Sequence, residues 1–516
     1  MKMKLPRTAL RLFERQLKSP NSGLYRPRIA SRCTGSRSCP APAPVGRRSY
    51  ATVSAAELEF GQPVHETHPH ILKAGEITPG ITAQEYADRR ARLALSLADG
   101  GVAILPASDL KYRSGAVFFP FRQESNFQYL TGFLEPESVA IITKTGPSYG
   151  DYEFHLFCRP KDPKAEQWSG PWSGLAAATD IFNADQAWDF YHLDTELPKL
   201  LRSAGRIYTS IDLSSPSSPS SSSSSNPTTT AAQVASVLSM SNNVSPLQPL
   251  VNQLRAVKSP AEITLMRAAG RASGRSITNA MRYAWTKEKD LHNYLDYEFT
   301  KQGCDTWAYV PVVAGGARGC MIHYVHNTAA LDAGDLVLVD AGGEYGGYVT
   351  DITRTWPVDG KFTDAQKDLY QAVLDAQRLG VGLCREDSGL TLDAIHRAVE
   401  AKLAEGLTQI GFDLDQGLLG GRRNAMNTLF PHHVGHYVGL DVHDVPGYGR
   451  SIPLKKGHCV TIEPGVYVPL DDDRWPRHFR GMAVRIEDSV CVDTDSPLVL
   501  TTEAVKEIVD IEALRS

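Results

Sequence analysis

Two aspartates beside a glycine-rich turn are the first residues whose type and spacing suggest chemistry. Asp340 ends the apolar run 336–339, and Asp351 follows Tyr348-Val-Thr after the turn. A hairpin of this length can face the two carboxylates towards each other. Carboxylates brought together inside a sheet repel each other, and burying them is costly unless a cation neutralises them. The pair alone is ambiguous, because acidic residues beside turns are usually solvated.

The second half of the chain adds histidines and glutamates to this pair. Four histidines stand between Pro431 and Asp444, and so many in a short span favour a site over ordinary packing. Glu463 and Glu487 lie in strand-like stretches, where period-two alternation directs each carboxylate away from the neighbouring isoleucine. Four carboxylates and one imidazole suit Mn²⁺ better than thiolate-preferring metals, and two divalent ions are needed to neutralise four acids. The predicted ligands are Asp340, Asp351, His436, Glu463 and Glu487.

These residues must be positioned by a chain that alternates helices with strands. Capping boxes at Thr82–Glu85, Ser259–Glu262 and Thr363–Gln366 predict three helix starts, the first of them opening a helix over 86–97. The order of elements favours an α/β (α+β) fold, with two C-terminal αβ halves whose sheets come together and whose helices pack outside. The expected strands are 102–105, 139–142, 336–339, 348–356, 459–468 and 483–492.

In order and local wording, the five predicted ligands resemble the Asp, Asp, His, Glu, Glu set of the pita-bread metallopeptidases, the family of methionine aminopeptidase, prolidase and aminopeptidase P. The stretch His436-Tyr-Val-Gly-Leu-Asp-Val-His443 is similar to aminopeptidase P rather than prolidase, as are 121–133 and 166–170. Residues 61–80 further resemble the mitochondrial members, which include the intermediate-cleaving peptidase. The resemblance implies a creatinase-like N-terminal α/β domain followed by a pita-bread catalytic domain.

The resemblance also implies a role for each ligand. Asp340 would chelate one ion, and Asp351 and Glu487 would bridge the pair. His436 and Glu463 would hold the second ion. A water between the ions would be the nucleophile, since two cations make hydroxide available near neutral pH and stabilise the oxyanion formed on the peptide carbonyl. Glu463 is also the candidate general base.

Further residues match family positions around the substrate. His323, His432 and His443 correspond to histidines that contact substrate and steady the tetrahedral intermediate, with ordinary polar packing as the alternative. Tyr467 and Arg485 are expected to line the same pocket. The alternative for Tyr467 is core packing, and for Arg485 it is a structural ion pair with a neighbouring acid.

The substrate and the assembly follow from the same resemblance. Aminopeptidase P removes a residue that precedes proline, whereas the mitochondrial relation implies trimming of one bulky residue from imported proteins. A prolidase-type dipeptidase and a non-catalytic, protein-binding pita-bread module are the competing interpretations, although all five ligands are present. Trp168 resembles a tryptophan that relatives insert into a neighbouring subunit, which predicts a homo-oligomer, but a single Trp is more often a core residue.

The first 50 residues differ in charge from the rest of the chain. They carry twelve Lys or Arg and one acid, Glu14, which gives this segment a charge of +11. Because the whole chain has a net charge of −4, residues 51–516 carry about −15. Such a basic, nearly acid-free segment predicts a mitochondrial transit peptide over 1–50, with a disordered basic arm as the alternative. Arg47-Arg-Ser-Tyr50-Ala51 resembles a cleavage site from which Tyr50 is trimmed. The expected location is the mitochondrion, in the matrix or associated with the inner membrane.

Composition sets the remaining boundaries. We expect a linker over 51–81, an aminopeptidase-P-like domain over 82–247 and the catalytic domain over 248–516. A Ser-, Pro- and Thr-rich stretch cannot bury enough apolar surface to order itself, which predicts a disordered insertion over 213–245.

Several function classes are disfavoured. The chain is 42% hydrophobic and 22% charged, as in soluble globular proteins, and has no apolar run long enough to span a bilayer. A nucleic-acid-binding role is disfavoured because the sequence after residue 50 has no basic patch. Ala341-Gly-Gly343 lacks the spacing of a dinucleotide cradle. The expected partners are therefore peptide or protein N-termini as substrate, with no nucleic acid and no transmembrane segment.

Overall fold

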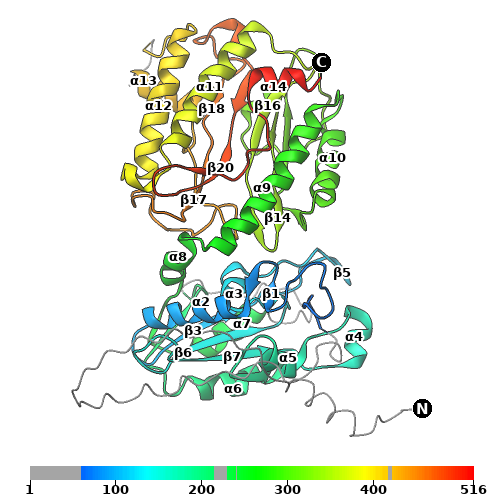
Figure 1. Cartoon of the computed structure of the whole chain (residues 1–516), viewed down its shortest axis with the longest axis vertical. Helices are drawn as coiled ribbons and strands as arrows, with labels where there is room; N and C mark the ends of the chain where they lie inside the picture. Colours follow the sequence, from blue (N-terminus) through cyan, green and yellow to red (C-terminus); the bar gives the residue numbers. More distant parts are fainter. Residues whose placement is uncertain (1–59, 214–228, 240, 416–420, 516) are drawn as a thin grey trace, which may run out of the picture. The chain divides into compact units, whose positions relative to one another are not determined.

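The computed structural model describes residues 60–213, 229–239, 241–415 and 421–515 (Figure 1). The predicted transit peptide, its cleavage site and the Ser-rich core of the expected insertion lie outside these residues. In the described part of the chain, no helix is long and apolar enough to cross a membrane.

The N-terminal domain is built on a six-stranded mixed sheet with strand order β10-β9-β3-β6-β7-β8. Its strands are β3 (Gly101–Pro106), β6 (Val139–Lys144), β7 (Tyr152–Cys158), β8 (Gln186–Asp189), β9 (Arg206–Thr209) and β10 (Val244–Pro246). Its helices are α2 (Ala83–Ser96), α3 (Ser125–Thr131), α4 (Pro163–Ser169), α5 (Gly174–Asp180), α6 (Leu193–Leu200) and α7 (Thr230–Leu238). Two short hairpins, β1 (Glu76–Thr78) with β2 (Ile81–Thr82) and β4 (Tyr112–Ser114) with β5 (Val117–Phe118), complete it.

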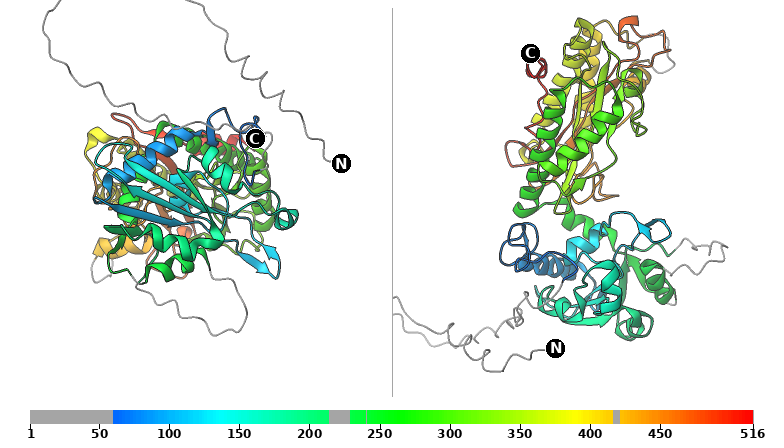
Figure 2. Two further views of the ribbon diagram at one scale, coloured as in Figure 1. Left: turned by 90° about the horizontal axis from the view of Figure 1, so that it is seen from below. Right: turned by 90° about the vertical axis from the view of Figure 1, so that its right-hand side faces the viewer.

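Both faces of this sheet are covered by helices. Along β3, Ala103 and Leu105 enter the apolar cluster that α2 shares, whereas Val102 and Ile104 enter the cluster that α6 and α7 share. Figure 1 shows α2 and α6 on opposite faces, and the left view of Figure 2 shows the twist of the strands. The expected helix and both expected strands of this domain are confirmed within one to three residues.

Two expected segments at the ends of this domain are more ordered than their composition indicated. The expected linker 51–81 contains β1 and part of β2, and its Val64 and Leu72 are buried in the domain. The expected insertion 213–245 contains α7 and most of β10. Val234 and Leu238 of α7 are fully buried, so apolar burial on one helix face orders the end of a Ser-rich stretch.

The C-terminal domain carries its strands in several short sheets. They are β11 (Thr306–Trp307), β12 (Val312–Gly315), β13 (Leu336–Asp340), β14 (Gly343–Tyr345), β15 (Tyr348–Val349), β16 (Thr353–Pro357), β17 (Cys459–Ile462), β18 (Gly465–Tyr467), β19 (Ala483–Arg485), β20 (Asp488–Cys491) and β21 (Leu498–Val499). The order is β12-β13-β16 in one sheet and β17-β20-β21 in another, with all neighbours antiparallel. Each of the expected strands 348–356, 459–468 and 483–492 is broken in two. The breaks fall at Asp351, Glu463 and Glu487.

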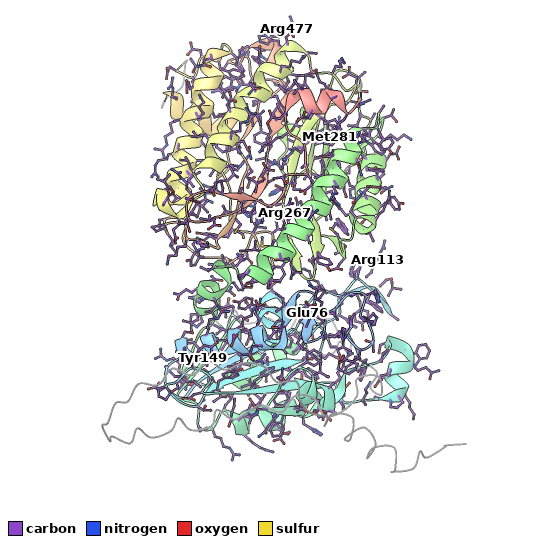
Figure 3. The ribbon with its side chains drawn as sticks, viewed as in Figure 1. Glu76, Arg113, Tyr149, Arg267, Met281 and Arg477 are labelled. Carbon is purple, nitrogen blue, oxygen red and sulfur yellow. The ribbon has the colours of Figure 1, made fainter. Side chains whose placement is uncertain are left out.

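Helices pack along these sheets, in the pairs α9–α10 and α11–α12 (Figure 1). The helices are α8 (Gln248–Ala256), α9 (Pro260–Met281), α10 (Glu288–Lys301), α11 (Asp364–Gly382), α12 (Leu392–Gln409), α13 (Gly421–Leu429) and α14 (Ile508–Ala513). The capping boxes predicted at Ser259 and Thr363 are both formed. On α9, Arg267 (Figure 3) binds Glu503 at 2.6 Å and so ties the helix to the C-terminal segment.

The capping box predicted at Thr82 is only half formed. Thr82 accepts a hydrogen bond from the backbone N–H of Glu85, but the Glu85 carboxylate does not return to the cap. It binds the buried guanidinium of Arg89 at 2.7 Å and accepts from the Ser259 hydroxyl at 2.7 Å. A buried cation and a second helix start therefore outcompete the local cap, and they link α2 to α9.

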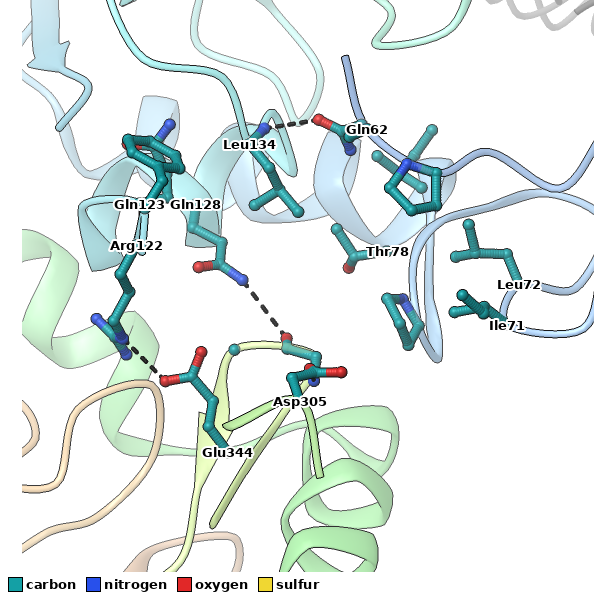
Figure 4. A pocket seen from close by; sticks show the side chains of 16 residues that line it. Gln62, Ile71, Leu72, Thr78, Arg122, Gln123, Gln128, Leu134, Asp305 and Glu344 are labelled. Atoms are coloured by element: carbon teal, nitrogen blue, oxygen red, sulfur yellow. Dashed lines mark hydrogen bonds and ion pairs between the residues drawn. The ribbon is translucent and has the colours of Figure 1, made fainter. Parts of the chain in front are cut away.

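A cavity of about 270 Å³ lies where the N-terminal domain meets the β14–β15 turn. It is lined mainly by apolar groups from 62–79 and by polar groups from 121–134 (Figure 4). Arg122 donates to Glu344 at 2.9 Å, and Gln128 donates to the Gly346 carbonyl at 3.4 Å. The cavity is lined by none of the predicted metal ligands.

Candidate metal centre

The predicted acids lie where strands begin or end. Asp340 is the last residue of β13, and Asp351 precedes β16, whose Thr353 is paired with Asp340. Glu463 follows β17 and Glu487 precedes β20, and these two strands pair Ile462 with Asp488. Each acid therefore lies at or next to the end of a paired strand.

His436 is held near the four acids by hydrogen bonds to Thr461 of β17, the strand that precedes Glu463. Its backbone N–H donates to the Thr461 hydroxyl at 3.0 Å, and its carbonyl accepts from the Thr461 N–H at 2.8 Å. The ring Nε2 then lies 3.4 Å from Asp351 Oδ2 and 3.5 Å from Glu463 Oε1. Ligand atoms of Asp351, His436 and Glu487 all lie within 4.8 Å of one another. Four of the predicted ligands are therefore brought together, and Asp340 is linked to Asp351 through the Tyr309 hydroxyl.

Crowding and burial raise the pKa values of three of the four acids, Asp340, Glu463 and Glu487. Burial raises the pKa of Asp340 to about 6, and burial together with the neighbouring acids raises the pKa of Glu463 to about 7. The pKa of Glu487 is raised well above its usual range by burial and by Asp351. Burial opposes charge on His436, but its contacts with Asp351 and Glu463 raise the pKa to about 9. Without a cation, Glu463 and Glu487 therefore favour their neutral forms, whereas the contacts with His436 lower the pKa of Asp351 despite its burial.

One buried oxygen tests whether these residues fit a cation. Glu487 is 1% exposed; its Oε2 accepts from the Thr353 hydroxyl at 2.6 Å, while Oε1 has no hydrogen-bond partner among the described residues. A buried carboxylate oxygen without a partner costs free energy unless something else satisfies it. Hard oxygen donors beside one imidazole suit divalent ions such as Mn²⁺. The donor set therefore fits a divalent-metal centre.

Tyr309 is a site residue that the sequence analysis missed. Its hydroxyl is hydrogen-bonded to Asp340 Oδ1 at 2.7 Å and also to Asp351 Oδ1. Burial and these carboxylates raise its pKa well above the usual range, so it stays a neutral donor. The surrounding Trp307-Ala-Tyr-Val-Pro carries no metal-ligand spacing, and only the fold brings it to the acids.

Arg485 and Tyr467 form a fixed chain behind the acids. Arg485 is 1% exposed, forms an ion pair with Asp340, and donates to the hydroxyls of Tyr467 at 2.8 Å and Thr353 at 2.9 Å. Tyr467 in turn bonds His432 Nε2 at 2.8 Å. This geometry supports the structural ion pair for Arg485 and polar packing for His432, because their polar atoms are engaged by protein groups.

The other two predicted histidines are exposed at the site. The rings of His443 and His436 are 4.4 Å apart and nearly perpendicular. Burial and the charge on His436 lower the pKa of His443, and the charge of His323 acts on it as well. Trp168 lies elsewhere, on α4, and is 91% exposed. Core packing is therefore wrong for Trp168, and within this chain it does not join the acids.

Comparisons with known proteins match two separate parts of the chain. Residues 86–208 match the aminopeptidase P N-terminal domain, and residues 264–494 match metallopeptidase family M24. Intermediate cleaving peptidase 55 from Saccharomyces cerevisiae is 42% identical over 458 residues, which are 88% of each chain. Xaa-Pro aminopeptidase 3 from Homo sapiens is 38% identical over 89% of this chain and 90% of its own. The crystal structure of Icp55 from S. cerevisiae is similar with a TM-score of 0.77 at 40% identity, over 86% of this chain and 99% of that one.

Proposed function

The chain belongs to metallopeptidase family M24 and is a metal-dependent aminopeptidase with a pita-bread catalytic domain. On this premise, we propose that it removes one N-terminal residue from proteins imported into mitochondria, using two Mn²⁺ ions. The observation that carries the proposal is the grouping of buried Asp351 and Glu487 and half-buried Glu463 around His436, with one Glu487 oxygen left unpartnered among the described residues. Four acids need two divalent cations for neutrality, and hard oxygen donors favour Mn²⁺.

In this proposal Asp340, Asp351, His436, Glu463 and Glu487 would hold the two ions, with Asp340 contributing to one ion, His436 and Glu463 to the other, and Asp351 and Glu487 to both. The bound ions supply Lewis acidity and lower the pKa of a water near the peptide carbonyl. Glu463, with its pKa raised to about 7 by burial and neighbouring acids, is suited to take a proton from that water. Arg485 holds Asp340 in place through an ion pair, and Tyr309 does so through a hydrogen bond from its hydroxyl.

The two exposed histidines are the candidates for contacting the substrate. We assign His443 and His323 to contact the substrate and the oxyanion, because the His443 ring lies 4.4 Å from that of His436 and His323 is close enough to His443 to affect its pKa. Burial and the charge on Arg485 lower the pKa of His432 to about 3, so it stays neutral at working pH. With both ring nitrogens bonded to protein groups, His432 acts by fixing Tyr467 beside Glu463.

A pair of peptides separates trimming of a bulky residue from cleavage before proline. The full chain, loaded with Mn²⁺, is offered Tyr-Ala-Thr and Arg-Pro-Pro, and released amino acids are measured. Turnover of Tyr-Ala-Thr supports trimming of imported proteins, and turnover of Arg-Pro-Pro alone supports an Xaa-Pro aminopeptidase, as the human relative is named. Cleavage of neither, with two ions bound, contradicts the proposal. The matched control is Glu487→Ala, which removes the unpartnered ligand and should hydrolyse neither peptide.

Two further parts of the proposal concern location and assembly. The acid-poor segment 1–50 supports import into mitochondria. Trp168 supports a homo-oligomer, because a side chain of that size is rarely 91% exposed on a monomer without a function. Trp168→Ala should lower the molar mass measured by light scattering. An unchanged mass would remove Trp168 from the interface.

A further inference from the structure

The loop that carries His443 is closed on itself. The Asp444 N–H donates to the Tyr437 carbonyl at 2.9 Å, and the Gly439 N–H donates to the Asp441 carbonyl at 3.0 Å. A Cβ on Gly439 would lie 2.6 Å from Asp444 Oδ2, so no other residue fits this turn without displacing Asp444. Val445 has φ +48°, which a β-branched residue adopts only when its surroundings impose it.

Two buried cations at the end of α8 hold the base of this loop. Arg255 donates to Asp444 and, at 2.7 Å, to Asp441, while Lys258 donates to Asp444 at 2.8 Å. Arg255, Lys258 and Asp444 are all buried. Asn252, also on α8, donates to the Pro446 carbonyl at 2.7 Å. The loop is therefore anchored at both of its aspartates and at its end.

The N-terminal domain reaches the same loop from the other side. Ser125, at the start of α3, donates to Asp441 Oδ1 at 2.6 Å. Arg122 donates to the Leu440 carbonyl, and Asn126 accepts from Arg255 at 2.6 Å. Side chains of the N-terminal domain thus contact the loop that contains His443, whose ring packs against that of His436.

We propose that Ser125 and Arg255 are positioning residues for the peptidase reaction, and that they act through Asp441 to hold His443 against His436. Asp441 is the point where the two domains converge, since it accepts from both residues. The N-terminal domain then completes the catalytic site by fixing a histidine that the catalytic domain provides. This inference rests on the role proposed above for His443.

A double-mutant cycle tests it. Peptide hydrolysis is measured for the full chain, Asp441→Asn, His443→Ala and the double variant, each loaded with Mn²⁺. Asp441→Asn should lower kcat by roughly ten- to a hundredfold, because small displacements of a catalytic group have effects of this size. In the His443→Ala background the same substitution should have no further effect. Equal losses in both backgrounds would overturn the proposal, because they would show that Asp441 acts independently of His443.

Further measurements separate positioning from general damage. Metal content should stay at two ions per chain in Asp441→Asn, and the pH dependence of kcat/KM should change, because the environment of His443 changes. Asp493→Asn, which breaks the Lys456–Asp493 ion pair of 2.7 Å, is the matched control and should leave kcat unchanged. If Asp441→Asn fails to fold, Ser125→Ala takes its place in the cycle. Full activity of His443→Ala would refute both the role of that histidine and this inference, whereas an inactive parent chain would refute the proposed function.

Discussion

Asp444 offers a quantitative test of the buried cluster that anchors the loop. Burial alone would raise the pKa of this carboxyl, but Lys258 and Arg255 outweigh burial and lower it from 3.8 to about 2. At about 1.36 kcal/mol per pKa unit, this shift corresponds to about 2 kcal/mol of stability. Asp444→Asn also leaves the buried Lys258 without an acid, although Arg255 keeps Asp441, so its cost at pH 7 should reach about 3–5 kcal/mol.

The pH dependence of this cost follows from the sign of the shift. A folded-state pKa below the unfolded value contributes stability above pH 4 that is lost as the pH falls towards 2. Roughly half of this stabilisation should remain at pH 3. Urea unfolding followed by tryptophan fluorescence, at pH 7 and pH 3, compares the parent chain with Asp444→Asn and Asp493→Asn. A loss below about 1 kcal/mol at pH 7, or a loss that grows towards pH 3, would refute the reasoning.

Three further outcomes concern the metal centre. Chelation should abolish peptide hydrolysis and lower the thermal unfolding midpoint, because the acids lose their counter-charge, and added Mn²⁺ should restore both. An unchanged midpoint in differential scanning fluorimetry would count against the metal centre. Glu463→Gln should lower kcat by about 10²-fold or more in a stopped peptide assay, and near-normal turnover would exclude Glu463 as the base. Tyr309→Phe should weaken metal binding about tenfold or more in titration calorimetry, because its hydroxyl holds Asp340 and Asp351; parent-like affinity would leave this tyrosine with a packing role only.

The sequence predicted the site better than it predicted the connections around the site. The acids could be located because each lies beside an apolar strand, and local periodicity is visible along a chain. Their convergence depends on strand breaks at Asp351, Glu463 and Glu487, which no periodicity indicates. Tyr309 could not be found for the same reason, since its partners Asp340 and Asp351 are distant in the sequence.

Composition alone does not show two short ordered segments. The Ser-rich composition of 213–245 hides α7, although Val234 and Leu238 supply the apolar spacing of one buried helix face. The short β1–β2 hairpin was read as linker, because two- and three-residue strands are too brief for an alternating pattern to appear. For Arg485, the sequence left a pocket residue and an ion pair open, and only the position of Asp340 distinguishes them.

The division of the acids between two ladders has a consequence for how the site can be made. Asp340 and Asp351 belong to the sheet of β13 and β16, whereas Glu463 and Glu487 flank β17 and β20, more than a hundred residues later. No contiguous peptide from either part holds more than half of the carboxylates. Tight metal binding therefore requires that the two sheets pack together first. The two ions should bind only to the folded catalytic domain, and they should dissociate when the sheets separate.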